Sequence, residues 1–212
     1  MKNLDKKTLL LIIGGAVLLI AVAGITYAFI EDYIDSEKSK QVTIESDTVD
    51  EFTFVTNGSL SLHATNETLP QNGSNLIATA TSTAKLKANS TTNSATKSYY
   101  LYAVISNNTF VEAQSGYPEV LLKVYDSSNT EITSLTGLTY NNTYGGFDIT
   151  GVNGTFTVAS NQSISSSSSQ TFTEQTWTFQ TIYLNHNFDQ TINYGKALNV
   201  NITMTVEPIV GS

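Results

Sequence analysis

Residues 198–206 read LNVNITMTV, and this stretch decides the fold class of the chain. Its apolar side chains, from Leu198 to Val206, occupy every second position, and asparagine or threonine occupies each position between them. A period of two residues puts alternate side chains on opposite faces of an extended strand. We therefore predict a β-strand over residues 198–206 that turns one face toward a hydrophobic core.

Seven other segments show a comparable strand-like pattern of apolar residues. They cover residues 59–64, 78–88, 99–105, 119–125, 146–150, 155–159 and 176–184. Turn-forming residues separate them, as at 126–129 and 141–146, and Asn153-Gly154 between two short apolar runs is a strong hairpin signal. No helical stripe of useful length follows Lys40. Eight strands without helices predict a mainly β fold, an antiparallel β-sandwich of the immunoglobulin-like kind.

Two details of this pattern are irregular. Within residues 176–184, Trp177 and Phe179 share one face, whereas Ile182 and Leu184 share the other. A β-bulge near Gln180 would reconcile the two sets, and we expect one there. The serine run at residues 165–169 predicts a flexible loop.

The first thirty residues predict that the chain is exported. Residues 8–30 carry no charge, and a helix of this length rises roughly 34 Å, enough to cross a hydrocarbon core of about 30 Å. Lysines lie before this segment, and acidic residues lie between positions 31 and 37. Because lysine-rich flanks stay inside, we predict a cytoplasmic N-terminus and a body on the extracellular side of the cell membrane.

The apolar segment could remain as a transmembrane anchor or be removed as a signal peptide, and both alternatives stay open. Small-residue patterns end at Ala23 and Ala28, which are the candidate sites for a signal peptidase. Against cleavage, Tyr27, Phe29 and Tyr33 could form an aromatic belt at the outer membrane interface. The predicted organisation is a basic n-region at 1–7, an anchor or signal peptide at 8–30, a polar linker or donor strand at 31–46, and an extracellular domain at 47–212.

Composition excludes several classes of function. All 10 basic residues are lysine, 18 residues are acidic, and the formal net charge is −8 at pH 7. Without a basic surface and without arginine, no nucleic-acid partner is predicted. The absence of cysteine excludes a disulfide framework, a thiolate metal site and a cysteine nucleophile. An exported domain without cysteine is typical of cell surfaces that do not rely on disulfides, such as those of many Gram-positive bacteria or archaea.

Few residues suggest chemistry. His63 and His186 are the only histidines, and neither lies in a motif with a nucleophile. We therefore predict no enzymatic activity and no cofactor. Lys85, Lys87 and Lys123 lie on predicted strands and could donate to an isopeptide crosslink with an asparagine. For Lys123, which is flanked by Leu122 and Val124, a solvent-facing side chain is the simpler interpretation.

One polar loop is a weak candidate for a calcium site. Asn185, Asn187, Asp189 and Asn193 place four oxygen-bearing side chains within nine residues, between two predicted strands. A single carboxylate offers little charge to a divalent cation, and the spacing does not fit an EF-hand. A polar hairpin loop is the preferred interpretation, so no metal is predicted.

Nine asparagines stand in Asn-x-Ser/Thr sequons and are candidates for glycosylation. They are Asn57, Asn66, Asn72, Asn89, Asn107, Asn141, Asn153, Asn161 and Asn201. The abundance of asparagine, serine and threonine explains much of this number, so the sequons alone do not establish modification.

Residues 24–32, GITYAFIED, resemble the end of the signal segment in the TasA/camelysin group of exported surface proteins. Members read close to Gly-x-Thr-(Trp/Tyr)-Ala-x-Phe followed by an acidic residue, and Ile30 stands where that pattern has phenylalanine. The stretches 58–62, 177–179 and 193–196 are also similar to surface proteins of this kind. The resemblance implies a jelly-roll-like β-sandwich that is exported, cleaved after Ala28, and assembled into extracellular fibres by donation of an N-terminal strand.

The segment after residue 30 would carry this function. Val42 and Ile44 form one short alternating pair, and Phe52 and Phe54 form another, so either could add as a strand to an open sheet edge. The alternative is a first strand that pairs within its own domain. Our leading hypothesis is a structural subunit of a cell-surface fibre, pilus or biofilm matrix that associates with itself.

The alternative function belongs to another class. A membrane-anchored monomer could act as an adhesin or glycan-binding module through its loops. Tyr140, Tyr144 and Phe147 would then be the aromatic platforms, although tyrosines near glycines more often pack within a turn.

Overall fold

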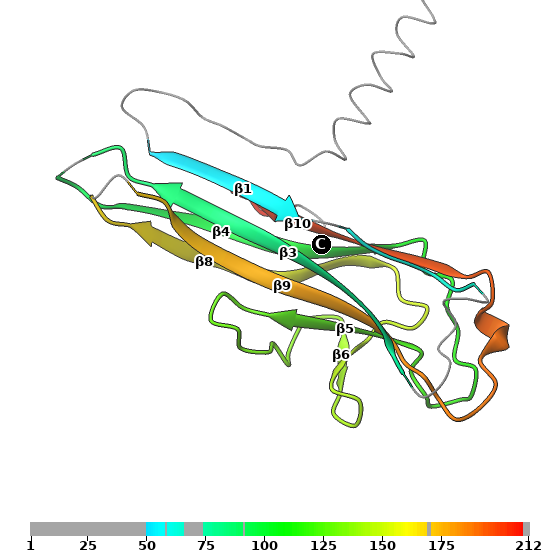
Figure 1. Cartoon of the computed structure of the whole chain (residues 1–212). Coiled ribbons are helices and arrows are strands. Elements are labelled where there is room, and N and C mark those ends of the chain that lie inside the picture. Colours follow the sequence, from blue (N-terminus) through cyan, green and yellow to red (C-terminus); the bar gives the residue numbers. More distant parts are fainter. Residues whose placement is uncertain (1–49, 58, 66–73, 91, 169–170, 210–212) are drawn as a thin grey trace, which may run out of the picture. The chain divides into compact units, whose positions relative to one another are not determined.

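The computed structural model describes residues 50–57, 59–65, 74–90, 92–168 and 171–209. These residues form ten β-strands and one short 3-10 helix, and they contain no α-helix (Figure 1). The strands are β1 (Glu51–Asn57), β2 (Leu60–His63), β3 (Leu76–Lys87), β4 (Ala95–Ser106), β5 (Val120–Tyr125), β6 (Thr139–Asn141), β7 (Gly146–Asp148), β8 (Gly154–Ser166), β9 (Thr173–Tyr183) and β10 (Ala197–Thr205), and the 3-10 helix η1 (Thr191–Asn193) precedes β10.

The membrane-related predictions fall outside this part of the chain. The apolar segment at 8–30 and the cleavage candidates Ala23 and Ala28 lie among the residues that the structure does not describe. Within the described residues, no helix has the length and apolar character needed to cross a membrane.

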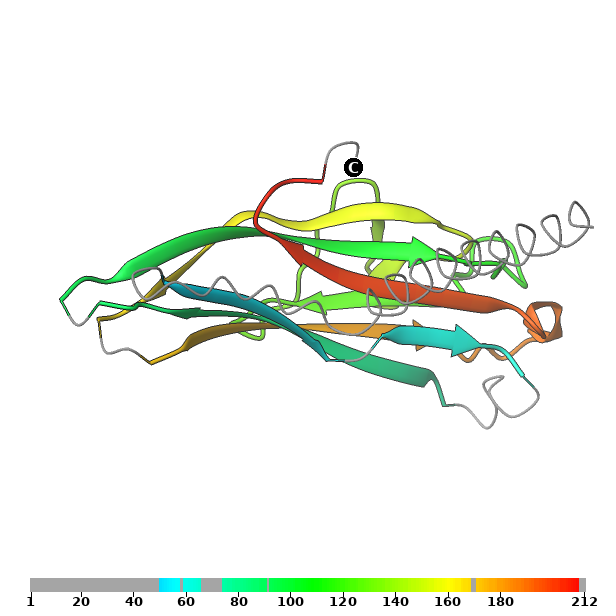
Figure 2. The same cartoon turned by 90° about the horizontal axis from the view of Figure 1, so that it is seen from above.

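The strands form two antiparallel sheets. The larger sheet has the order β1-β3-β9-β5-β7-β6, and the smaller sheet has the order β2-β10-β4-β8. Consecutive strands alternate between the two sheets from β2 to β5 and again from β7 to β10. Apart from β6 and β7, neighbours within a sheet are therefore not consecutive in sequence. Figures 1 and 2 show the long strands lying along a common axis, with arrows in both directions.

All eight predicted strands are present, and the mainly β prediction is confirmed. The strand predicted at 198–206 is β10, with Leu198, Val200, Ile202 and Met204 buried and the residues between them more exposed. Two strands go beyond the prediction. β1 contains the aromatic pair proposed as a donor, and β6 begins at Thr139 and ends inside a segment predicted as a turn.

The bulge expected near Gln180 is absent, and that prediction is wrong. Gln180 pairs with Thr79 on one side and Lys123 on the other, without a register shift. Ile182 points away from the main core because a second cluster, formed with Leu121 and Leu184, covers the opposite face of the larger sheet at this end. Apolar residues on both faces of one strand mimicked a bulge in the sequence pattern.

The register shifts lie elsewhere, between β4 and β8. Tyr99 pairs with Gln162 but Tyr102 pairs with Thr157, so β8 carries extra residues relative to its neighbour. Asn161 lies in this interval with a positive φ of 50°. Asparagine tolerates this conformation better than most residues, which fits a bulged strand.

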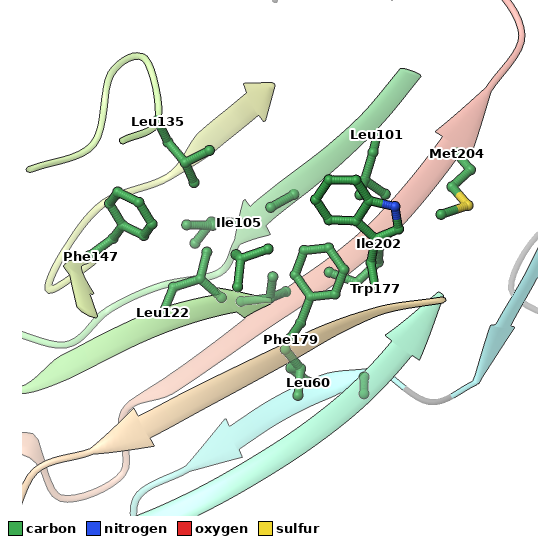
Figure 3. Close-up of a cluster of buried hydrophobic side chains, with 14 of the residues drawn as sticks. Leu60, Leu101, Ile105, Leu122, Leu135, Phe147, Trp177, Phe179, Ile202 and Met204 are labelled. Atoms are coloured by element: carbon green, nitrogen blue, oxygen red, sulfur yellow. The ribbon is translucent and has the colours of Figure 1, made fainter. Parts of the chain in front are cut away.

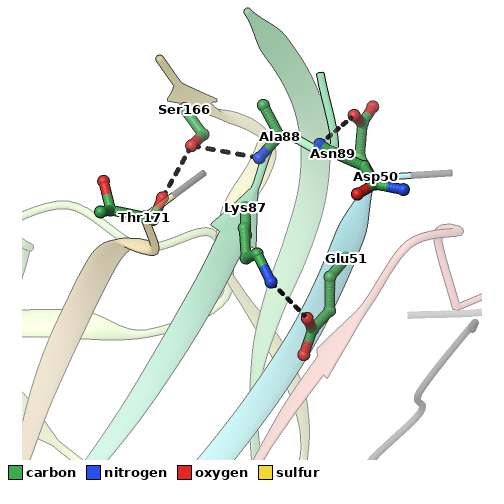
Figure 4. A network of polar contacts seen from close by, with 7 residues as sticks. All are labelled: Asp50, Glu51, Lys87, Ala88, Asn89, Ser166 and Thr171. Carbon is green, nitrogen blue, oxygen red and sulfur yellow. Dashed lines mark hydrogen bonds and ion pairs between the residues drawn. The ribbon is translucent and has the colours of Figure 1, made fainter. Parts of the chain in front are cut away.

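The prediction of a flexible loop at 165–169 is wrong for its first two residues. Ser165 and Ser166 belong to β8, and Ser166 is buried. Its hydroxyl donates to the carbonyl of Thr171 (3.1 Å) and accepts from the amide of Ala88 (3.3 Å), as Figure 4 shows. A small side chain that bonds both neighbouring segments therefore holds this end of the strand.

The main core contains buried residues from both sheets. Figure 3 shows Trp177 and Phe179 of the larger sheet close to Leu101 and Ile202 of the smaller one. A hydrogen-bond chain also joins the sheets: the Trp177 indole N–H donates to the Tyr99 hydroxyl (2.8 Å), which donates to the Gln175 side-chain oxygen (2.9 Å). Burial raises the pKa of Tyr99, and this hydrogen bond from Trp177 opposes that rise.

Candidate functional site

The donor-strand candidates divide between described and undescribed residues. Phe52 and Phe54 lie in β1, which pairs with β3 of the same chain from Glu51 to Asn57. Val42 and Ile44 lie outside the described residues. The structure thus places the aromatic pair in a strand of its own domain, and the pair at 42 and 44 remains the candidate for donation.

Polar contacts hold the start of β1 (Figure 4). The Asp50 carboxylate accepts from the Asn89 amide (3.3 Å), and its second oxygen lies 3.7 Å from the Lys97 amine. Glu51 forms a comparable pair with Lys87 at 3.7 Å. All four side chains of these two ion pairs are partly exposed. The ion pairs therefore contribute little to the stability of the domain, although they help to position the start of β1.

The two β1 aromatics face the core without being buried by it. Phe52 and Phe54 contact each other edge to face (4.9 Å between centroids) and lie 6.4 and 5.9 Å from the ring of Tyr99. Both pack against the main core, yet both keep part of their surface exposed. Inward-facing phenylalanines are usually buried, so this side of the core is incompletely covered.

The smaller sheet is short of a strand on this side. β1 forms seven residue pairs at the edge of the larger sheet. In the smaller sheet, β2 has only four residues and pairs with β10 from Ala197 to Val200. Among the described residues, none pairs with β10 from Asn201 to Thr205 on the side away from β4. We name this segment of β10, residues 201–205, the open edge.

The free edge of β8, on the other side of the smaller sheet, is protected. Among the described strands β8 pairs only with β4, but it carries the register shifts described above and alternates polar residues along its length. Bulges and polar side chains are the usual devices by which native edge strands avoid pairing with other chains. The open edge of β10 has no register shift against β4 and continues the alternation of buried apolar residues.

The two histidines have different surroundings. His63 is exposed at the end of β2. His186 bonds the carbonyl of Pro118 through Nε2 (2.8 Å) and stacks on Phe188, with 4.7 Å between the ring centroids. The rings of Tyr117 and Tyr144 approach His186 edge to face. The His186 ring is thus part of an aromatic cluster that packs the loops against the larger sheet.

The residues proposed for calcium hold the loop itself. Asn193 is buried, and its side chain exchanges two hydrogen bonds with the backbone of Val111, at 3.0 and 2.9 Å. A carboxylate oxygen of Asp189 accepts from the Thr191 amide (2.8 Å), and the hydrogen bonds from Thr191 lower the pKa of Asp189. The backbone amide of Asn185 donates to the side-chain oxygen of Asn75 (2.8 Å), and Asn187 is exposed. Within the described residues, no group of three or more histidines and carboxylates could hold a metal ion.

Sequence reasoning missed a buried polar network that joins the loops before β5 and after β9. Glu119 is 0% exposed, and its carboxylate accepts from the Ala113 amide (3.0 Å) and the Gln190 side chain (2.6 Å). Gln190 also donates to the carbonyl of Leu184 (2.8 Å). Burial, and then the nearby Glu119 charge, raise the pKa of Tyr183. Nothing in the sequence distinguishes Glu119 from an exposed residue at the start of a strand.

The side chains of Asn108 and Asn153 also join two loops through hydrogen bonds to the backbone. The Asn108 side chain donates to the carbonyls of Ile149 (2.6 Å) and Val152 (2.9 Å). Asn153 bonds the Asn108 backbone in both directions, at 2.9 and 3.0 Å. These contacts hold the turn before β8 against the end of β4.

The aromatic platform proposed for a glycan is not formed as expected. Phe147 is 0% exposed and belongs to the main core, so it presents no surface to a ligand. Tyr140 packs edge to face on Phe147 and donates a hydrogen bond to Glu131 (2.8 Å), which raises the pKa of Tyr140. Tyr144 packs on the second cluster. The loop aromatics serve packing within the turn.

The lysines and sequons have the following positions. Lys85 pairs with Glu174 (2.7 Å), and Lys123 pairs with Glu131 (3.8 Å). Seven of the nine sequon asparagines are described: Asn57, Asn107, Asn153, Asn161 and Asn201 are exposed, and Asn89 and Asn141 are half-buried. Asn66 and Asn72 lie outside the described residues.

Comparison of the chain with family models, with curated proteins and with solved structures finds no match. The resemblance to the TasA/camelysin group therefore stays a prediction from short motifs.

Proposed function

We propose that this chain is an exported structural subunit of an extracellular fibre or matrix that associates with itself by strand donation. Its domain would be a jelly-roll β-sandwich. The strand order supports this arrangement, since β2-β10-β4-β8 and β3-β9-β5-β7 are two four-stranded sheets between which the chain alternates. β1 and β6 extend the larger sheet at its two edges.

One observation carries the proposal: the core is uncovered where the smaller sheet lacks a strand. Phe52 and Phe54 face inward but keep exposed surface, and β10 runs past the end of β2 without a further partner among the described residues. A strand added from another chain gains main-chain hydrogen bonds and covers apolar surface at the same time. Self-assembly is the function that uses this geometry.

The polar side chains favour a structural role over catalysis. His186 is bonded to a backbone carbonyl, and the buried carboxylate of Glu119 accepts from two neutral donors. Both groups join loops to strands. Export and membrane contact rest on the sequence, in which the apolar segment at 8–30 is preceded by lysines.

The test is a deletion in the proposed donor segment. The full-length chain would be produced in a host that exports it, and the mature N-terminus would be determined by intact mass. Electron microscopy of the wild type should show filaments, whereas deletion of residues 40–46 should abolish them because the donated strand is lost. Circular dichroism of the deletion variant should keep its β signature.

A matched control sharpens this experiment. Replacing Val42 and Ile44 with serine should prevent assembly, while replacing Gln41 and Thr43 with serine should not, because only the first pair would face the core of a neighbour. Filaments from the deletion variant would overturn strand donation from this segment. A wild type that stays monomeric at every concentration would overturn the proposed function.

The alternative, a tethered glycan-binding module, is favoured by one observation. Tyr117 is 38% exposed and packs edge to face against His186 and Phe188, so an aromatic surface is available beside polar loop residues. If the wild type is monomeric, binding to a glycan array that is lost in Tyr117→Ala would support this module. An array without binding would remove it.

A further inference from the structure

The open edge of β10 can be resolved to individual peptide groups. The Ala197 carbonyl accepts from the amide of Thr109 (3.0 Å), on the β4 side, and the Lys196 carbonyl accepts from the amide of Ala64 (2.8 Å), on the β2 side. The direction of peptide groups alternates along a strand. Even-numbered residues of β10 therefore point toward the β2 side.

This parity identifies the groups without a neighbour. β2 pairs with β10 only as far as Val200. The N–H and C=O groups of Ile202 and Met204 therefore face the open edge, where no described strand pairs with them. Their side chains belong to the main core and are 8% and 9% exposed (Figure 3). The edge thus offers unpaired backbone directly beside the main core, against which the partly exposed Phe52 and Phe54 also pack.

We propose that the open edge, residues 201–205 of β10, is the acceptor site for residues 40–46 of a second copy of the chain. This proposal rests on the proposed function and names its acceptor. Every strand pair in both sheets is antiparallel, so the added strand runs antiparallel to β10. Val42 then lies opposite Met204, and Ile44 lies opposite Ile202.

The sequence of the donor segment fits this edge. Residues 40–46 read KQVTIES, with two β-branched apolar residues at the spacing that puts both on one face. An edge of five residues is about 17 Å long at roughly 3.4 Å per residue, and seven donor residues suffice to cover it. Thr43 then lies opposite Thr203, on the face away from the core.

The occupant is a second copy because of how the chain enters β1. Contacts of Asp50 with Asn89 and Lys97 fix the first residue of the domain at the start of that strand. Four peptide units join Ser46 to Asp50, and they span at most about 14 Å. With Val42 opposite Met204, Ser46 would lie opposite Val200, which is five residues, or about 17 Å, from Thr205. Asp50 is held through Lys97, beyond Tyr100, the partner of Thr205, so a donor segment at this register comes from a second copy.

Cysteine pairing tests the site directly, because the chain has no cysteine of its own. One full-length copy would carry Thr43→Cys and another would carry Thr203→Cys, both exported and mixed under mild oxidation. The two positions are opposite each other at a pair without backbone hydrogen bonds, where side chains are close enough for a disulfide. We expect a disulfide-linked dimer that requires both variants.

The matched control places the second cysteine on the free edge of β8. Ser163 is exposed on β8, and mixing Thr43→Cys with Ser163→Cys should give at least tenfold less dimer. Equal crosslinking of both mixtures would overturn the acceptor site. An intrachain disulfide in the Thr43→Cys, Thr203→Cys double variant, without dimer in the mixture, would overturn the second copy as occupant.

Electron microscopy of the same samples separates the two proposals. Filaments with no Thr43–Thr203 crosslink would overturn the acceptor site and leave assembly by strand donation standing. Protein that neither crosslinks nor forms filaments would overturn both.

Discussion

The two ends of the domain are held by different interactions. The loops before β5 and after β9 are joined by buried groups, with the side chains of Glu119, Gln190 and Asn193 each making at least two hydrogen bonds. The start of β1 is held by half-exposed ion pairs, and its phenylalanines are incompletely covered. Buried hydrogen bonds tolerate little change, whereas exposed ion pairs are weak. The difference suggests one end built for rigidity and another open to a partner.

The largest contrast should come from phenylalanines at the two regions. Phe147→Ala should destabilise the domain by about 3–5 kcal/mol because this side chain is completely buried. Phe54→Ala should cost the dispersed protein only about 1–2 kcal/mol, since part of the ring is already exposed. Urea unfolding of both variants measures the difference. Equal losses would contradict the claim that the core is uncovered beside β1.

The second-largest change in the free energy of unfolding is expected in the buried polar network. Asn193→Ala removes both partners of the Val111 backbone and should destabilise the domain by about 2–3 kcal/mol. Thr191→Ala, in the same helix but exposed, is the control and should change the free energy of unfolding far less. If the two variants unfold at the same urea concentration, the network does not hold this end.

Tyr183→Phe should act in the opposite direction. The Tyr183 hydroxyl is buried, and the described residues give it no hydrogen bond of standard geometry, although the nearby Asn193 side chain lowers its pKa. Its removal should therefore stabilise the domain by up to about 1 kcal/mol at pH 7. Because folding raises the pKa of Tyr183, the unfolded chain ionises first as the pH rises above about 10, and the free energy of unfolding of the wild type falls until the folded pKa is reached. Wild type should therefore lose more stability than Tyr183→Phe above pH 10. Parallel pH profiles by thermal unfolding would contradict this.

The smallest effect is expected at the start of β1. Lys97→Ala removes the partner of Asp50 at 3.7 Å and should change the free energy of unfolding by no more than about 0.5 kcal/mol. A loss above 2 kcal/mol, measured in the same urea series, would show that this end is as rigid as the other.

The sequence predicted the strands better than their surroundings. Alternation alone located β10 and the other long strands, because burial of one face imposes a two-residue period. It failed at Ile182 because both faces of β9 are covered there, and period two then carries no information about which face is inside. β6 was missed since three residues give no period at all.

The candidate site was predicted only in part. The short alternating pairs pointed to β1, but the missing neighbour of β10 follows from the length of β2, which no local pattern determines. Likewise, the sequence alone makes Asn193 a candidate metal ligand, because an asparagine whose side chain bonds a distant backbone looks like any other in sequence. These two segments lie about 80 residues apart in sequence, so their contact can be recognised only in the folded structure.

Amide hydrogen exchange at β10 tests the central claim most directly. In dispersed protein, the amides of Ile202 and Met204 should exchange quickly, while the amide of Thr203, which faces β4, should exchange slowly. On assembly, the first two should become at least a hundredfold slower and Thr203 should change little. Ile202 and Met204 amides that are already slow in dispersed protein, or that stay fast in filaments, would contradict the account.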